Sequence, residues 1–196
     1  MTDIRALKEQ TKEIFKSVFE RDGFEDVTVY VSTVRRFLTC GWERTTGAKK
    51  HISVTVSDSL IYEPKDIIRD MANVVRSAVN HEPIAYTEEM KQRFLSDEFR
   101  KDHLSTYLAR LRRKHPQDAS GTERLNGLFS ELNLSTDVKV TITTADIKYE
   151  PVAVPTLGLI VVDEDAAENL PDLTLKAQLK EAFERLVKGR EHIRNH

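Results

Sequence analysis

The sequence predicts an α+β fold of two related helix–strand–strand–helix units that are joined by a helical connector. Residues 26–33, DVTVYVST, return in altered form as residues 137–144, DVKVTITT. Each copy follows an amphipathic helical pattern and precedes a second apolar strand pattern, a proline (Pro64 or Pro171) and another amphipathic helical pattern. Short strands rich in valine and threonine also resemble one another by composition alone. The shared order of elements is therefore the stronger argument for an internal duplication.

The first unit is predicted to span residues 1–80. Its first helix, which Gly23 ends, is predicted by apolar residues at helical spacing, namely Ile4, Leu7, Ile14, Phe15, Val18 and Phe19. Alternation predicts a strand over residues 27–32, and residues 52–56 predict the return strand of a hairpin. The polar segment 33–50 is expected to be the long loop between them. Pro64 suits the first turn of a second helix that packs on the hairpin.

A helical connector with a linker is predicted for residues 81–120. Residues 87–94 and 98–114 predict one kinked helix or two separate helices with a shared apolar stripe. Pro116 ends this run, and residues 116–121 are the best candidate for a linker.

The second unit is predicted to span residues 121–196. Its pattern predicts a helix over residues 125–132, strands over 138–143 and 157–162, and a last helix that Gly189 ends. The intervening loop contains Pro151 and Pro155, and the tail after Gly189 is expected to fray. In the two units together, alternation predicts burial of most of these strand residues: Val27, Val29, Val31, Val54, Val56, Val138, Val140, Ile142, Ile160 and Val162.

The composition is that of an ordinary soluble globular protein. The 196 residues are 39% hydrophobic and 32% charged, with a net charge of −2. The longest apolar runs fall far short of the roughly 20 residues that span a bilayer, and the charged N-terminus differs from a signal peptide. We therefore expect a cytoplasmic protein with no membrane partner. A single cysteine, Cys40, excludes an intramolecular disulfide.

Residues 27–80 resemble the SprT-type minimal zinc metallopeptidases in layout. The shared features are a strand, a glycine-containing loop with an aromatic residue (Cys40, Gly41, Trp42), and a strand and turn that lead into a helix. In that family the helix carries His-Glu-x-x-His, which binds zinc and supplies the general base. Here the corresponding residues 73–77 read Asn-Val-Val-Arg-Ser. The resemblance therefore implies an inactive relative that retains the scaffold.

The remaining histidines do not form a metal motif. His81 lacks a second histidine four residues later, and His103 and His115 would be out of register on a shared helix. We interpret all three as surface residues, His81 in a turn. No metal or other cofactor is expected.

Nucleophilic catalysis is a weak alternative. Cys40 lies in a basic segment that would favour its thiolate form, and His51 could then serve as a base. The structural interpretation is that Cys40 is a small buried residue. No glycine-rich nucleotide motif is present, and the acidic residues 163–169 lack EF-hand spacing, so we interpret them as a solvated loop and helix start.

Two basic clusters suggest a polyanion-binding surface. The first combines cations with an aromatic residue in one loop and the second ends a helix; their members are Arg35, Arg36, Trp42, Arg44, Lys49 and Lys50, and Arg110, Arg112, Arg113 and Lys114. Such cations neutralise phosphates, and aromatic rings stack on bases. The structural alternative is that the helix-end cations complement the helix dipole and that Trp42 covers the core.

The sequence as a whole favours a non-catalytic interaction or scaffold protein on a degenerate metallopeptidase-like frame. One alternative is a nucleic-acid-binding protein that uses the basic loop 35–50 and the helix end 110–114. Another is a hydrolase with an unrecognised site, which converging histidines and carboxylates would favour. The partner is expected to be a protein or a nucleic acid.

Overall fold

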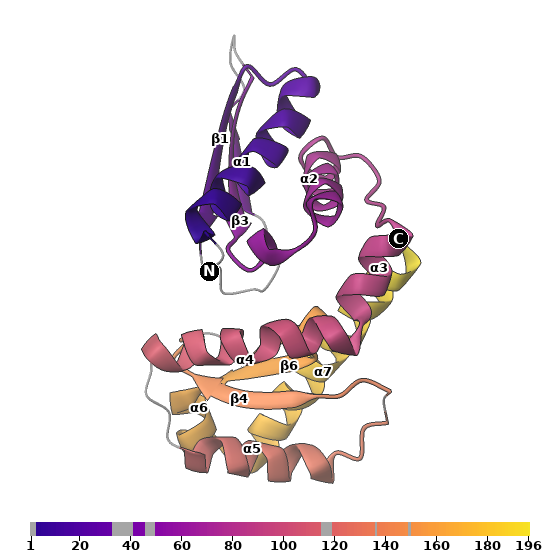
Figure 1. The fold of residues 1–196 in the computed structure, drawn as a ribbon. Coiled ribbons are helices and arrows are strands. Elements are labelled where there is room, and N and C mark those ends of the chain that lie inside the picture. Colours follow the sequence, from indigo (N-terminus) through magenta and orange to yellow (C-terminus); the bar gives the residue numbers. More distant parts are fainter. Residues whose placement is uncertain (1–2, 33–40, 46–49, 115–118, 136, 149) are drawn as a thin grey trace. The chain divides into compact units, whose positions relative to one another are not determined.

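The computed structural model describes residues 3–32, 41–45, 50–114, 119–135, 137–148 and 150–196. Helices and two three-stranded sheets form the described part, which confirms the α+β class (Figure 1). The chain divides into two compact units, one formed by the residues up to Gln92 together with His196 and the other by residues 93–195. The boundary falls inside the segment 81–120, so the helix over residues 97–114 belongs to the second unit.

The first unit contains two long helices and three strands. Their bounds are α1 (Ile4–Arg21), β1 (Asp26–Ser32), β2 (Gly41–Thr45), β3 (His51–Ser57), the 3₁₀ turn η1 (Leu60–Tyr62) and α2 (Lys65–Val79), after which α3 (Glu88–Leu95) begins. α1 starts at Asp3, whose carboxylate accepts hydrogen bonds from the backbone N–H groups of Arg5 (2.9 Å) and Ala6 (3.3 Å). It ends just before Gly23, whose φ of 81° favours glycine.

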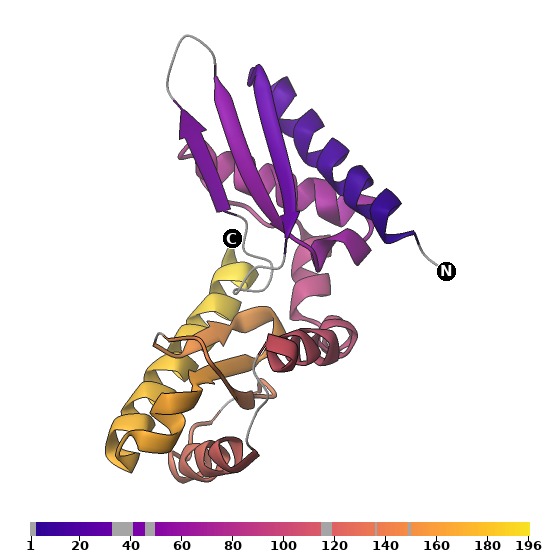
Figure 2. The same ribbon diagram turned by 90° about the vertical axis from the view of Figure 1, so that its left-hand side faces the viewer.

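The first sheet has the strand order β1-β3-β2. β1 and β3 are parallel, with Val29 opposite Val54, and β2 is antiparallel to β3. The predicted hairpin is therefore wrong, because its two strands are parallel neighbours and β2 lies in the predicted loop. A parallel pair needs a long crossover connection, which the segment 33–50 provides. Both helices, α1 and α2, lie on the same face of this sheet (Figure 2).

The core of the first unit lies between the sheet and these two helices. Ile52, Val54 and Val56 of β3 are fully buried there, together with Phe15 and Phe19 of α1. The predicted burial of Val54 and Val56 is thus confirmed. Alternation along β3 leaves its other side chains on the opposite face of the sheet.

Five predicted core residues are only half-buried, against the prediction: Val27, Val29, Val31, Val138 and Val140. Val27, Val29 and Val31 lie on β1, an edge strand that has a neighbouring strand on one side only. Val138 and Val140 precede their strand, which begins three residues later than predicted, at Thr141.

The second unit contains a sheet of the same order. Its elements are α4 (Asp97–Lys114), α5 (Ala119–Glu131), β4 (Thr141–Ala145), β5 (Val152–Val154), η2 (Pro155–Leu157), β6 (Leu159–Asp163), α6 (Glu164–Asn169) and α7 (Asp172–Asn195). β4 is parallel to β6 and β5 is antiparallel to it, in the order β4-β6-β5. β5 lies in the predicted loop. The two sheets share their order and strand directions, which an internal duplication would produce.

Helices cover both faces of the second sheet. Ile142, Ile160 and Val162 are buried in a cluster with residues of α5 and α7, as predicted. Thr143 and Val161 point to the opposite face and are only 3% and 1% exposed. α4 lies on that opposite side (Figure 1).

Three rings of α4 are spaced four residues apart and are buried: Phe99, His103 and Tyr107. The His103 ring centroid lies 4.5 Å from that of Phe99, so the prediction of a surface histidine is wrong. Burial raises the pKa of Tyr107 to about 12, and its hydroxyl therefore stays neutral at ordinary pH. α4 is held to the sheet by Arg100, which donates to the Leu157 carbonyl (2.9 Å) and the Thr141 hydroxyl (2.6 Å).

α7 continues past Gly189 to Asn195, against the prediction of a helix end and a frayed tail. Gly189 serves close packing instead, because a Cβ there would lie 2.3 Å from Cγ of Pro155. Beyond it, Arg190 donates to the carbonyls of Pro155 (3.0 Å) and Leu95 (2.9 Å), and Ile193 is buried. These contacts keep the last turns in place.

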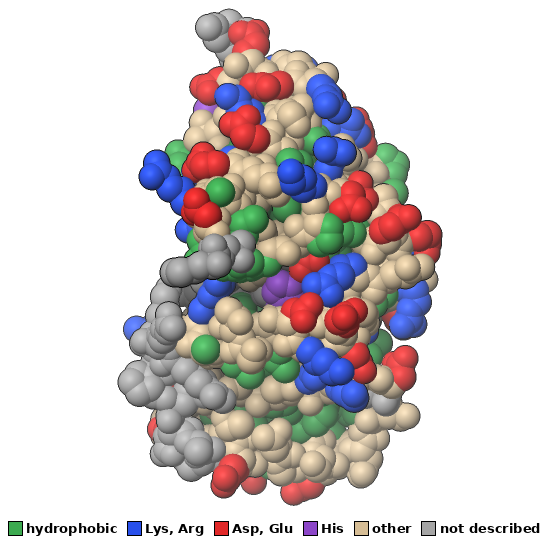
Figure 3. All heavy atoms as spheres, viewed as in Figure 1, with side chains coloured by type: hydrophobic (Ala, Val, Ile, Leu, Met, Phe, Trp, Pro, Cys, Tyr) green, Lys and Arg blue, Asp and Glu red, His purple; other side chains and the backbone are tan. Residues whose placement is uncertain are grey.

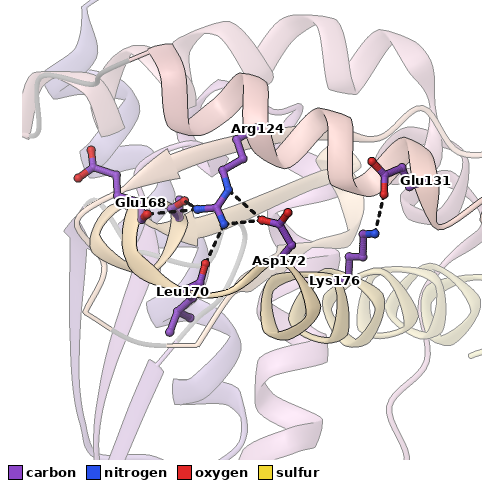
Figure 4. Close-up of polar contacts among 7 residues, drawn as sticks. Arg124, Glu131, Glu168, Leu170, Asp172 and Lys176 are labelled. Carbon is purple, nitrogen blue, oxygen red and sulfur yellow. Dashed lines mark hydrogen bonds and ion pairs between the residues drawn. The ribbon is translucent and has the colours of Figure 1, made fainter.

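Arg124 of α5 binds the connection between α6 and α7 (Figure 4). Its guanidinium donates to the carbonyls of Ala167 (2.7 Å), Glu168 (3.2 Å) and Leu170 (2.8 Å), and to the Asp172 carboxylate. The planar guanidinium suits several acceptors at once. Arg124 thus supplies donors for carbonyls that the end of α6 leaves without helical partners.

Candidate interaction surface

The face of the first sheet opposite α1 and α2, here called the open face, is polar. Alternation places on it the residues of β1 and β3 that do not enter the core. Seven exposed or half-buried residues of β1 and β3 lie on it, namely Asp26, Thr28, Tyr30, Ser32, His51, Ser53 and Thr55, whereas Ser57, opposite Ser32, is buried. No described helix of the first unit lies on this side, which faces the viewer in Figure 2.

Tyr30 is an exposed aromatic side chain of the open face, with 56% of its surface exposed. It lies opposite Thr55 in the sheet, and Thr28 lies opposite Ser53. Thr28, Ser53 and Thr55 are half-buried. The centre of the face is therefore an aromatic ring among hydroxyl groups, each of which can donate and accept hydrogen bonds.

The side chains of His51 and Asp26 are hydrogen-bonded at one end of the open face. His51 Nδ1 lies 2.8 Å from Asp26 Oδ2, and the two side chains are 36% and 66% exposed. A contact that is this exposed to solvent contributes little to stability.

The hypothesis that Cys40 and His51 act together concerns a residue outside the described part of the chain. His51 lies on β3 opposite Asp26 of β1, and its cooperation with Cys40 stays a hypothesis.

The predicted polyanion residues of the first unit are only partly described. Arg35, Arg36 and Lys49 lie outside the described residues, as does the side chain of Arg44 on β2. Lys50 is exposed, and its Nζ lies 5.9 Å from the centre of the Phe24 ring.

Trp42 is 46% exposed at the edge of the sheet. It lies opposite Val54, and side chains of directly paired residues point to the same face. Trp42 therefore lies on the helix-covered face, whereas Tyr30 lies on the open face. These two rings do not form one stacking platform.

The second predicted basic cluster belongs to the second unit. Arg110 is half-buried on α4, and Arg112, Arg113 and Lys114 end that helix with side chains outside the described part. The two clusters thus fall in different units. On the side shown in Figure 3, acidic and basic side chains are interspersed.

The positions that would carry the metallopeptidase motif have other contacts here. Val74 and Val75 of α2 are buried in the core, and Arg76 binds Glu82 (3.0 Å). His81 is exposed just after α2 with a φ of 59°, so the predicted surface turn is confirmed, and His115 lies outside the described residues. Within the described ranges, no three histidine, cysteine or acidic side chains are grouped as metal ligands.

Among the acidic residues 163–169, Asp163 has a structural role. The Asp163 carboxylate accepts from the N–H of Ala166 (3.2 Å) and caps α6, as a helix start requires. Its other oxygen accepts from the N–H groups of Ile147 (3.2 Å) and Lys148 (2.8 Å).

The polar residues that alternate with apolar ones in β1 and β3 are the sequence signal for the open face. Thr28 and Tyr30 alternate with the half-buried valines of β1, and Ser53 and Thr55 alternate with the buried apolar residues of β3. What alternation cannot show is whether a distant helix covers these polar positions.

Comparison with known proteins identifies no matching family, no matching characterised protein and no matching solved structure. Among the described helices, none combines the length and the apolar character needed to cross a membrane.

Proposed function

We propose that this chain is a non-catalytic binding protein and that a partner protein docks on the open face of its first sheet. One observation carries the proposal. The two sheets have the same order and strand directions, yet α4 covers in the second unit the face that no described helix of the first unit covers. The sheet of the first unit is thus incomplete by comparison with the sheet of the second.

The chemistry of the open face supports a protein partner. The seven residues of β1 and β3 named above include no lysine or arginine, whereas nucleic-acid surfaces depend on such cations. Tyr30 offers apolar area and a hydroxyl in one side chain, a combination enriched at the centres of protein interfaces. The surrounding hydroxyls can bind polar groups of the partner.

The second unit indicates what the partner presents. α4 lies beside its sheet and carries three buried rings one turn apart, Phe99, His103 and Tyr107. We expect the partner to present a helix with a similar stripe. Because the open face has more hydroxyl groups than the face under α4, that helix should be more polar and the complex reversible.

We also propose that the frame is a degenerate, metallopeptidase-like scaffold that arose by duplication. The order β3, η1 and α2 is the order that the resemblance requires. Val74 is buried in the core at the position where the family carries the general base, so the helix contributes to stability in place of chemistry.

Site-specific photo-crosslinking tests the docking surface. A photoreactive phenylalanine analogue at Thr28 or Thr55 is expected to capture one defined protein, because both positions lie on the open face. The control is the same analogue at Leu173, which is 82% exposed in the second unit. Equal capture from all three positions, or capture that Tyr30→Ala leaves unchanged, would contradict the proposal.

A second candidate function, polyanion binding, rests on the cations of residues 35–50 and 110–114. If it holds, the affinity for a labelled single-stranded oligonucleotide falls steeply with salt, since each neutralised phosphate releases counterions. Arg112→Glu with Arg113→Glu should weaken it further, as measured by fluorescence anisotropy. The control, Lys65→Glu with Arg69→Glu, makes the same charge change on the exposed side of α2. Absence of binding at low salt, or equal weakening by both variants, would exclude this function.

A further inference from the structure

Among the described strands β1 lies at the edge of its sheet, and no described residue hydrogen-bonds to the outer row of its backbone groups. The Ser32 carbonyl accepts a hydrogen bond from the N–H of Asp58 (3.0 Å), so the peptide groups of Ser32 point toward β3. Peptide groups alternate in direction along a strand. The N–H and C=O groups of Val27, Val29 and Val31 therefore point away from β3, toward the outer edge of the sheet.

This edge lacks the features that usually prevent strand pairing. β1 has seven residues, with no proline, lysine or arginine, and its only charge is Asp26 at the first position. Edge strands that are not pairing sites are commonly short, charged or interrupted. The edge strands of the second sheet are shorter, with five residues in β4 and three in β5.

The side chains of β1 are also incompletely covered. Val27, Val29 and Val31 share a face with Ile52, Val54 and Val56, which are fully buried, yet they are themselves only half-buried. One further strand beside β1 would extend this apolar layer and cover the three valines.

We propose that a second copy of this chain supplies that strand, and that the two β1 strands pair antiparallel about Val29. In this register Val29 faces Val29 of the second copy, and Val27 faces Val31 of the second copy. Each of the three outward N–H groups of one copy then donates a hydrogen bond to an outward C=O group of the other copy. The valines of both copies lie on one face, and the two sheets join into one.

The side chains on the other face of the joined strands, the open face, also fit this register. Thr28 faces Tyr30 of the second copy, a β-branched and aromatic pair that stabilises antiparallel strands. Asp26 faces Ser32 of the second copy, so no like charges meet. Strand pairing buries less area than the roughly 800 Å² per partner of a standard interface, so we expect a reversible dimer.

Analytical ultracentrifugation of the full chain, from micromolar to millimolar concentration, tests the dimer. Wild type is expected to shift from monomer to dimer as its concentration rises. Val29→Pro removes an outward donor without removing a hydrogen bond to β3, and should shift the dissociation constant upward at least tenfold.

Charge complementation tests the register independently of that proline. A chain with Thr28→Lys and Tyr30→Lys, and a chain with Thr28→Glu and Tyr30→Glu, should each remain monomeric, because like charges face each other across the edge. Their mixture should form a heterodimer. The control, Ser53→Lys with Thr55→Lys, places the same charge on the central strand and should dimerise as wild type does.

A wild type that stays monomeric at every concentration overturns the proposal, as does dimerisation that these changes leave unaffected. If the chain is monomeric but still gives crosslinks from Thr28 or Thr55, the dimer proposal is wrong. The proposal that a partner docks on the open face is then unaffected. Pairing of β1 with a strand from a different protein would likewise contradict self-association.

Discussion

Gly158→Ala is expected to destabilise the second unit by about 4 kcal/mol or more, the largest effect of any single substitution considered. Gly158 has a φ of 57°, and an added Cβ would lie 2.3 Å from the backbone oxygen of Lys139. Its own carbonyl accepts the N–H of Thr141 at 2.8 Å, at the start of β4. Any movement that relieves the clash therefore disturbs the parallel pairing of β4 with β6. Urea unfolding followed by circular dichroism measures the loss.

Gly127→Ala is the matched control for this substitution. Gly127 lies within α5, and an added Cβ there would meet nothing within 4 Å. Alanine favours a helix over glycine by roughly 1 kcal/mol, so this change should stabilise the protein. Equal midpoints for Gly158→Ala and wild type would show that the turn before β6 tolerates a side chain.

Arg124→Ala is expected to cost roughly 2 kcal/mol, because it leaves the carbonyls of Ala167 and Leu170 and the carboxylate of Asp172 without this donor. Partial exposure of the guanidinium limits the loss, since water can replace it. Arg124→Lys should recover less than half of the stability, because a lysine cannot present several donors in one plane. Chemical denaturation of the three proteins measures both values.

Lys176→Ala is the control for Arg124→Ala, because it also removes one positive charge that contacts α5. Lys176 pairs with Glu131 of α5 at 2.5 Å, and it makes this one ion pair only among the contacts described (Figure 4). A partly exposed pair contributes about 0.5 kcal/mol. If Arg124→Ala proved no worse than Lys176→Ala, the connection between α6 and α7 would not depend on Arg124.

The central strands of the two sheets were predictable because their apolar alternation is regular. Ile52, Val54 and Val56 follow it in β3, and Ile160 and Val162 follow it in β6. β2 and β5 were not predictable, since they are short edge strands in which pairing with β3 and β6 outweighs a weak local pattern. Strand direction was not predictable either, because apolar alternation is the same in a hairpin and in a parallel pair.

Long-range packing explains the other differences. Gly189 has the sequence signature of a helix end, but its missing side chain allows α7 to approach Pro155 instead. His103 has charged neighbours along the sequence, yet α4 turns it inward beside Phe99. The open face depends on the same effect, because Thr28 and Ser53 are ordinary polar residues until the structure shows that no described helix of their unit covers them.

The measurement that tests the docking surface most directly is the crosslinking yield at Thr55 relative to that at Leu173. Thr55 lies on the central strand beside Tyr30, within the open face, and Leu173 is more exposed but belongs to the other unit. We expect capture of a single partner protein at Thr55, little at Leu173, and a severalfold loss at Thr55 when Tyr30 is changed to alanine. Equal yields at the two positions, or a yield at Thr55 that does not depend on Tyr30, would contradict docking on the open face.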